Sequence, residues 1–221
     1  MIPVSAPPRV RERLRSAPDG PVTVVHRGPD AVYVDVDGWC VGVLGHRATA
    51  VPCGLRTSLP TLPRVAGARV RDGVLHLDDV PLAIGRLVDV RAPTLHGRSA
   101  GAELTATEVA GLVGRGDGLT PYGDDVLCGW LGIHRAAGIE TAEVDAVVRE
   151  QLGRTTLLSA TLLDCAIHGE VIPEFAAYVA ALGTSEETGR AAALAAVGHS
   201  SGRGLLEGAQ RALAVTDVVA A

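Results

Sequence analysis

Glycines, hydroxyl groups and carboxylates are concentrated in GRGDGLTPYGDD, residues 114–125, between two apolar segments with helical periodicity. Glycines allow backbone N–H groups to turn toward one point, and the following helix adds the positive end of its dipole. The stretch therefore predicts a site for a phosphate or carboxylate, with Gly116, Gly118 and Thr120 as contacts. A tight turn between helices, with Asp124 as the N-cap, explains the same residues, and the spacing alone does not decide between the two.

The adjacent Asp124 and Asp125 come at the start of a predicted helix. Neighbours on a helix point about 100° apart, so these carboxyl groups are not expected to form a facing acid–base pair. The helix dipole favours the charged form of both, which predicts a poor general acid. Asp124 suits a cap. Asp125 suits an acceptor for a substrate N–H or a ligand for a cation such as Mg²⁺, and no other cofactor is predicted.

A second polar stretch is VGHSSGRG, residues 197–204, whose Gly198–Gly202 segment matches the G-x-S-x-G pattern of a nucleophile elbow. That elbow needs a preceding strand, whereas the residues before it are alanine-rich and carry helix signals, so we reject a hydrolase of this class. A hydroxyl-rich helix start remains, which suits an anion or simple capping. Its polar side chains are His199, Ser200, Ser201 and Arg203.

A third polar stretch is RTTLLSATLLDCAIHGE, residues 154–170. One interpretation places Thr156, Ser159 and His168 around a polar cavity, with Asp164 orienting the imidazole at a spacing of four. In the other, the hydroxyl groups bond to their own helix and His168 favours the helix C-terminus. We favour the second for His168, and both remain open for Ser159.

Composition and charge limit the classes of protein and partner. The chain has 221 residues, of which 47% are hydrophobic and 20% charged, as in globular proteins. The formal net charge is −5 and basic residues form no cluster, so nucleic acid is not an expected partner. No apolar run approaches about 18 residues, so no membrane span is expected. Charged residues near the start do not fit a secretory signal, which predicts a cytoplasmic protein.

All twenty basic side chains are arginine, because the chain contains no lysine. This excludes Schiff-base chemistry and the phosphate-binding lysine of P-loop proteins. A bound anion must instead be held by arginine, histidine, hydroxyl or backbone N–H groups.

The four cysteines occur singly, as Cys40, Cys53, Cys128 and Cys165. Without a C-x-x-C pair, and in a chain long enough to need no covalent staples, they are expected to be reduced and buried. A structural zinc site is not predicted.

The first half of the chain is valine-rich and roughly alternating, which favours β-strands. Strands are expected over 21–28, 31–38, 39–45 and 81–90. Residues 68–79 predict a hairpin whose Asp72 and Gly73 suit a type I′ turn. A helix is expected near residues 8–16, and residues 50–64, with three prolines, are expected to be irregular.

Beyond about residue 104 the period changes to 3.6, which predicts helices. A glycine follows nearly every segment, at the position expected after a helix C-terminus. Thr184 and Glu187 predict a capping box. Helices are expected over 107–113, 124–137, 141–152, 156–168, 171–182, 184–197 and 202–215.

These patterns predict an α+β protein. Its N-terminal half would be β-rich, as a barrel or a meander, and packed on an all-α C-terminal half. The expected subdomains are residues 1–100, with a short leading helix, and residues 101–221, which carry the three polar stretches.

Those three stretches, in this order, resemble the oxamate carbamoyltransferase subunit family of bacterial allantoin catabolism, which was long a domain of unknown function. The resemblance rests on GLTPYGDD, TTLLSA and GHSSG and covers about residues 114–208. Shared positions are Gly118, Leu119, Thr120, Pro121, Gly123, Asp124, Asp125, Ser159, His199, Ser200, Ser201 and Gly202.

The resemblance implies a subunit of a multi-component enzyme that moves a carbamoyl group between an oxalurate-type ureide and phosphate. It implies partner subunits and a small anionic substrate, and it leaves open whether the chain also assembles with itself. By their chemistry alone, Asp125, His199 and Ser200 are the candidate catalytic residues, with His199 as proton shuttle. The candidate anion-binding residues are Gly116, Gly118, Thr120, Asp124, Ser159, Ser201 and Arg203.

Two other functions fit the same residues. One is a stand-alone hydrolase, lyase or cyclase acting on a small acidic metabolite. The other is a non-catalytic assembly subunit, in which the polar loops only cap helices.

Overall fold

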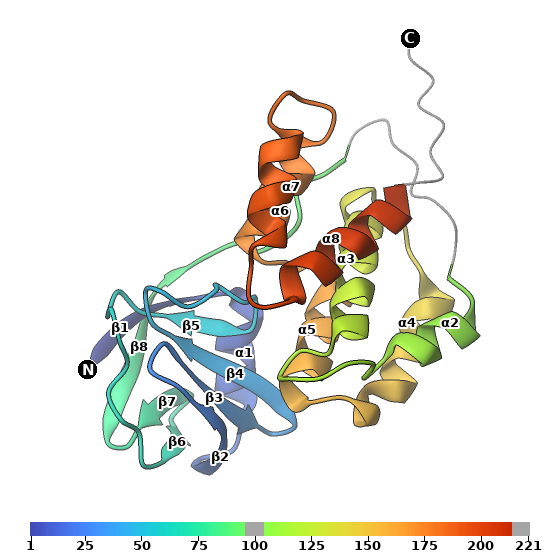
Figure 1. Ribbon diagram of the computed structural model, residues 1–221. Coiled ribbons are helices and arrows are strands. Elements are labelled where there is room, and N and C mark those ends of the chain that lie inside the picture. The colour runs from blue at the N-terminus through green and yellow to red at the C-terminus, as the bar shows by residue number, and fades with distance from the viewer. Residues whose placement is uncertain (96–103, 214–221) are drawn as a thin grey trace. The chain divides into compact units, whose positions relative to one another are not determined.

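The computed structural model describes residues 1–95 and 104–213, and the chain forms two compact units, Met1–Val90 and Arg91–Ala221 (Figure 1). The expected subdomain boundary at residues 100 and 101 lies outside the described residues, as does the end of the last helix at Val215. An α+β protein with a β-rich N-terminal half is confirmed, because the first unit is a barrel and the second is helical.

Strands of the first unit form a closed barrel in the order β1-β5-β4-β3-β2-β6-β7-β8. Neighbouring strands are antiparallel except at two places, where β1 pairs with β8 and β4 with β5 in parallel. Closure leaves no strand edge open for pairing with another chain. The strands are β1 (Ile2–Ala6), β2 (Gly20–Arg27), β3 (Ala31–Val36), β4 (Trp39–Leu44), β5 (Gly54–Arg56), β6 (Ala68–Arg71), β7 (Val74–Leu77) and β8 (Val80–Leu87).

Local pattern explains most of these strands. β2 alternates between half-buried and exposed side chains along its whole length, as its sequence predicts. The β6–β7 hairpin turns at Asp72 and Gly73 with φ of 51° and 71°, which confirms the expected type I′ turn. Two features were not predicted, namely strand β1 and strand β5, which lies within the segment expected to be irregular.

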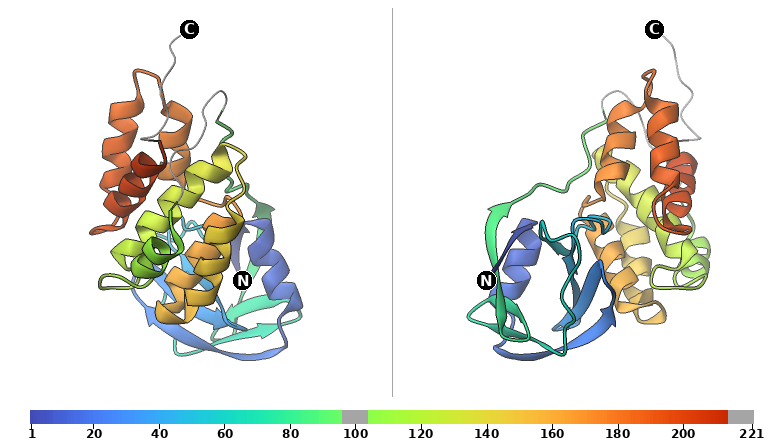
Figure 2. Two further views of the ribbon diagram at one scale, coloured as in Figure 1. Left: turned by 90° about the vertical axis from the view of Figure 1, so that its right-hand side faces the viewer. Right: turned by 60° about the vertical axis from the view of Figure 1, so that its left-hand side comes forward.

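Helix α1 (Pro8–Ser16) lies beside the barrel and buries Val10 and Leu14 (Figure 2). Proline at its first turn fits the missing N–H there. Arg13 on another face of α1 lies over the Trp39 ring, 5.7 Å from its centroid. The four cysteines form no disulfide and all are buried, as expected.

The second unit is built around α3 (Tyr122–Ala136), which is buried on all sides from Gly123 to His134. Most of its buried side chains are apolar, as expected for such a helix, and it packs against α5 and α8. The other helices are α2 (Ala106–Leu112), α4 (Ala142–Gln151), α5 (Leu157–Ile167), α6 (Pro173–Ala181), α7 (Glu187–Ala195) and α8 (Ser201–Leu213), with a 3₁₀ turn at Leu152–Arg154.

Helices α3 and α8 approach so closely that only glycine fits at their crossing. A Cβ on Gly129 would lie 2.0 Å from the Leu205 carbonyl oxygen, and a Cβ on Gly208 would lie 1.9 Å from that of Val126. Real Cβ contacts are essentially never shorter than 3.0 Å. Backbone contact between α3 and α8 therefore fixes the position of the α8 start.

Several helices begin at a different residue, or have a different capping residue, from those predicted. Helix α2 is capped by Thr105, two residues before the predicted Thr107, in a complete capping box with Glu108. The capping box expected at Thr184 is wrong, because α7 begins later and Glu187 accepts a hydrogen bond from the Gly183 N–H instead. Among the described helices, none is both long and apolar enough to cross a membrane.

Candidate functional site

Hydrogen bonds bring the starts of three helices to the loop at residues 114–120. Thr120 Oγ1 lies 2.8 Å from Ser201 Oγ, at the start of α8. Thr156, the N-cap of α5, donates from Oγ1 to the Leu119 carbonyl oxygen at 2.5 Å. Helix α3 begins directly after the loop. The starts of α3, α5 and α8 therefore meet at one place, where their partial positive charges add.

The Asp124 side chain links the elements of this cluster through hydrogen bonds. Its side chain is fully buried, and its Oδ1 accepts from the Gly114 N–H at 2.7 Å. Its Oδ2 accepts from Ser159 Oγ at 2.7 Å and also from Thr155 Oγ1. The expectation that Asp124 caps its own helix is wrong, because Pro121 occupies the N-cap. Asp124 instead joins the end of α2 to the start of α5.

Asp125 lies in a different environment. It is 5% exposed, and its Oδ2 is buried without a hydrogen-bond partner among the described residues. Burial raises its pKa from the usual 3.8 to about 7, a hydrogen bond from Ser201 opposes that rise, and the charge of Asp124 adds to it. The expectation of a poor general acid is therefore wrong, because loss of water outweighs the helix dipole.

Helix α8 supplies the wall that buries Asp125. Gly204 lies one turn after Ser201, and a Cβ on it would be 2.7 Å from the Asp125 Cβ and 3.1 Å from the Tyr122 carbonyl oxygen. Glycine at this position lets α8 close over the carboxyl group. The α8 start thus provides one hydroxyl partner to Asp125 and excludes water from the rest.

The glycine loop itself is exposed at Gly116 and Gly118, whose φ angles of 116° and 91° favour glycine. A Cβ on Gly116 would lie 2.9 Å from the Tyr122 backbone nitrogen, so the loop folds back onto the start of α3. Among described residues, the N–H groups of residues 116–120 have no partner within the chain. Leu119 is 43% exposed at the tip of the loop.

The remaining predicted residues lie at the rim. His199 is exposed, and Arg203 donates from Nη2 to the His199 carbonyl oxygen at 2.8 Å, within its own helix start. Ser200 is half-buried, and its carbonyl oxygen accepts from the Gly204 N–H. Since α7 and not a strand precedes this segment, rejection of the nucleophile elbow is confirmed.

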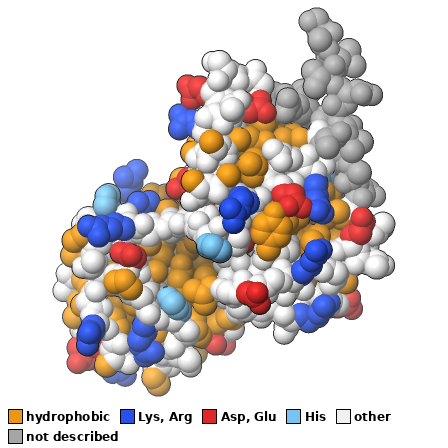
Figure 3. Space-filling model, in the orientation of Figure 1, with side chains coloured by type: hydrophobic (Ala, Val, Ile, Leu, Met, Phe, Trp, Pro, Cys, Tyr) orange, Lys and Arg blue, Asp and Glu red, His pale blue; other side chains and the backbone are white. Residues whose placement is uncertain are grey.

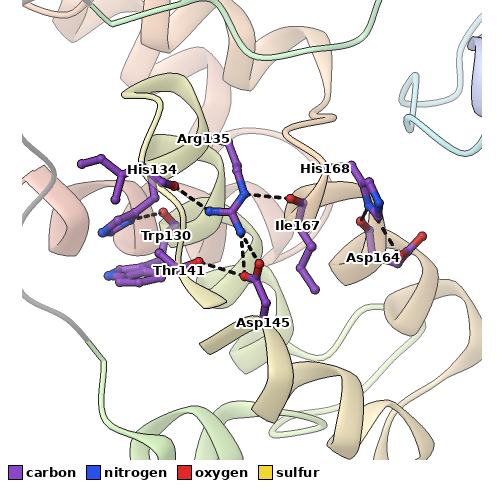
Figure 4. A network of polar contacts seen from close by, with 9 residues as sticks. Trp130, His134, Arg135, Thr141, Asp145, Asp164, Ile167 and His168 are labelled. Atoms are coloured by element: carbon purple, nitrogen blue, oxygen red, sulfur yellow. Dashed lines mark hydrogen bonds and ion pairs between the residues drawn. The ribbon is translucent and has the colours of Figure 1, made fainter. Parts of the chain in front are cut away.

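His168 lies at the far end of α5 from Ser159, so the structure does not bring these two side chains together. Its Nδ1 lies 2.7 Å from the Asp164 carbonyl oxygen and 3.6 Å from Asp164 Oδ1 (Figure 4). The interpretation of His168 as a helix C-terminal residue is therefore confirmed.

A buried network anchors the opposite end of α3. Arg135 donates to both carboxyl oxygens of Asp145 at 2.6 Å and to the carbonyl oxygens of Ile167 and Ile139 at 2.8 Å (Figure 4). Thr141 Oγ1 donates to the same carboxylate at 2.8 Å. This network fixes α3 to α4 and α5, so the helix that carries both aspartates is held at both ends.

Sequence reasoning missed two groups that build the site. Thr155 is one of them. Two threonines precede the predicted helix, and since only one of them can be its N-cap, the other can bond a residue outside that helix. The glycines of α8 were also missed, and the signal was available, because Gly204 and Gly208 are spaced by four and so lie on one face.

In the described part of the chain, no group of three His, Cys, Asp or Glu side chains is placed to hold a metal ion. The Asp125 Oδ2 atom, which has no hydrogen-bond partner among the described residues, would be only one ligand for a metal ion.

The fold and the site define an α+β protein in which a glycine-rich loop and three helix starts surround one buried carboxyl group. Residues 112–213 match the model of a family described as oxamate carbamoyltransferase subunit AllH. The match spans the three polar stretches and so confirms that they resemble this family. No curated protein and no solved structure matches the chain.

Proposed function

We propose that this chain is a carbamoyltransferase-type subunit and that the cluster at the three helix starts is its anion-binding site. The family match, described as a subunit, supports the class of enzyme. The observation that carries the site is the Asp125 Oδ2 atom, which is buried without a hydrogen-bond partner among the described residues, while Ser201 bonds the same carboxyl group.

The substrate class would be a small ureide or carboxylate, together with phosphate or carbamoyl phosphate. An anion would be held by the free N–H groups of residues 116–120 and by the hydroxyl groups of Thr120, Ser200 and Ser201. Preorganised N–H donors of this kind also stabilise the charge that develops during acyl transfer. Arg203 would also bind the anion, after its guanidinium group leaves the His199 carbonyl oxygen.

Asp125 would supply the proton. In transfer from an oxalurate-type ureide, a phosphate oxygen attacks the carbamoyl carbon and the bond from that carbon to the ureide nitrogen breaks. The leaving nitrogen takes one proton and departs as the amide of oxamate. A carboxyl group with a pKa of about 7 is well matched to this transfer at neutral pH. His199, exposed at the rim, would return the proton from solvent.

Ligand binding to the purified chain tests this proposal. Thermal unfolding would be followed with phosphate, carbamoyl phosphate, oxamate and Mg²⁺. A ligand at 100 times its Kd adds about 2.7 kcal/mol to the unfolding free energy, which is readily measured. We expect stabilisation by phosphate or carbamoyl phosphate that is lost in Asp125→Ala and Ser200→Ala.

Asp117→Asn is the matched control, because it removes an exposed negative charge from the same loop. It should bind an anion as wild type does, or more tightly. Binding that is unchanged in both Asp125→Ala and Ser200→Ala would show that the site is misplaced. No stabilisation by any of the four compounds would favour the non-catalytic assembly subunit.

A further inference from the structure

A hollow of about 400 Å³ lies within the barrel unit, between α1 and the strands β7 and β8. Its volume falls within the range of about 300–1,000 Å³ that small-molecule sites occupy. All of its lining residues belong to the Met1–Val90 unit, so it is a separate feature from the cluster around Asp125.

Positive charge dominates the wall of this hollow. Arg11 and Arg15 reach it from α1 and Arg86 from β8, whereas Asp72 is its one acidic lining residue. In the described part of the chain, none of the three guanidinium groups forms an ion pair. Across the face drawn in Figure 3, acidic and basic side chains are interspersed.

Arg11 provides the strongest sign of an anion-binding site. Its Nε atom is buried and has no hydrogen-bond partner among the described residues. A buried donor on a charged group is costly when it is unsatisfied. An anion in the hollow would pair with the same guanidinium group and offset the cost of its partly buried charge, so the hollow suits an anion.

Backbone geometry keeps the hollow open. Strand β8 has one extra residue opposite β1, because Val4 pairs with Ile84 and Ser5 with Arg86, which leaves Gly85 in a bulge. A Cβ on Gly85 would meet nothing within 4 Å, so this glycine faces open space at the wall.

On the opposite wall, the hairpin turn sits tightly against α1. A Cβ on Gly73 would lie 3.2 Å from the Arg15 Cα, so glycine at the turn lets the β6–β7 hairpin approach the helix. Apolar side chains also line the hollow, namely Val74, Leu82 and Ile84, and we call them its floor.

We propose that this hollow binds a phosphate monoester, with the phosphate held by Arg11, Arg15 and Arg86 and a short apolar group resting on the floor. Three guanidinium groups against one carboxylate favour a dianion over a monoanion. Arginine is suited to phosphate through its planar set of donors. Nothing in the carbamoyl-transfer proposal requires this second site.

Calorimetric titration of the full chain with phenyl phosphate at pH 7.5 tests the proposal, with inorganic phosphate, benzoate and phenol as comparisons. We expect saturable binding of phenyl phosphate with a Kd below about 1 mM. Inorganic phosphate should bind more weakly because it lacks the apolar group, benzoate because it is a monoanion, and phenol should not bind.

Variants locate the site. Arg86→Gln removes an exposed arginine of the wall and should weaken binding of phenyl phosphate by about tenfold, as should Arg11→Gln. Gly85→Leu fills the open space without a steric conflict and should also weaken it. Arg13→Gln is the matched control, because Arg13 is on the same helix but lies over Trp39, and its binding should equal that of wild type.

The Ser200→Ala variant separates this site from the one in the helical unit, since it should bind phenyl phosphate as wild type does. Absence of saturable binding to wild type would overturn the proposal. So would equal affinity in wild type, Arg86→Gln and Gly85→Leu, or an equal loss in Arg13→Gln, which would reflect net charge alone.

Discussion

Asp124 and Asp125 are neighbours in the chain, yet the regions around them are held together in different ways. On the Asp124 side, three donors from the α2 end and the α5 start converge on one carboxyl group. On the Asp125 side, α8 is held against α3 by close backbone packing at glycines, and one carboxyl oxygen has no partner in the described part of the chain. In the first region the hydrogen bonds to the carboxyl group are all made within the chain. In the second region one carboxyl oxygen is left for a ligand.

The difference shows how burial alone does not assign a role. Both aspartates are almost completely removed from solvent. What separates them is whether each oxygen has a donor, because a satisfied buried group contributes to stability whereas an unsatisfied one costs free energy. Substitutions at the two positions should therefore have opposite consequences.

The largest expected effect is on the Asp124 side. Asp124→Ala removes the shared acceptor of the Gly114 N–H, Thr155 and Ser159. At about 1–3 kcal/mol for each donor left unsatisfied, the unfolding free energy should fall by at least about 3 kcal/mol. Urea denaturation measures it, with Asp117→Ala as the exposed control in the neighbouring loop. A loss below about 1 kcal/mol would contradict a structural role for Asp124.

The second effect concerns pH and the Asp125 side. Because its pKa rises from 3.8 to about 7 on folding, the folded state binds more protons than the unfolded state between these values. The unfolding free energy should therefore fall as pH rises through that window, by up to about 1.4 kcal/mol per pH unit from this group.

Asp125→Asn should remove this contribution and be at least as stable as wild type at pH 8. Urea denaturation of both proteins at intervals from about pH 4 to 8 provides the measurement. Parallel curves for the two proteins across the whole range would mean that Asp125 is not the group whose burial is costly.

The smallest of the three effects tests the packing that hides Asp125. Gly208→Ala would place a Cβ against the Val126 carbonyl oxygen, and this backbone atom cannot move aside. We expect a loss of about 1–3 kcal/mol of unfolding free energy. Gly189→Ala in α7 meets nothing within 4 Å and should instead stabilise by about 0.5–1 kcal/mol. Equal effects of the two substitutions would argue against close contact of α3 and α8.

Local signals predicted much of the secondary structure. Valine-rich alternation located β2, β3 and β4, and the Asp72–Gly73 turn was correct because its φ angles depend on those residues alone. Gly138, Gly169 and Gly183 all have positive φ at helix ends, as their positions suggested. These features depend on neighbours in sequence, which a single sequence reveals.

Features that depend on distant residues were not predictable in the same way. Asp124 looked like a cap, because its partners Gly114, Thr155 and Ser159 come from two other places in the chain, the end of α2 and the start of α5. The direction of the Asp125 pKa was wrong, because the local dipole is visible in sequence whereas burial by α8 is not. The residue types were enough to locate a candidate site. The different hydrogen-bonding of its two aspartates depends on packing, which the sequence does not reveal.

The parallel pairing of β1 with β8 also has a consequence for how the chain acquires its structure. Ile2 finds its partner at Leu82, and a ribosome that adds about 5–20 residues per second reaches Leu82 several seconds after Ile2. The β2–β3–β4 segment can pair locally in the meantime, and β1 can pair with β5 but not yet with β8. Closure should therefore be the late and slow step of barrel formation, as is usual for contacts between distant residues.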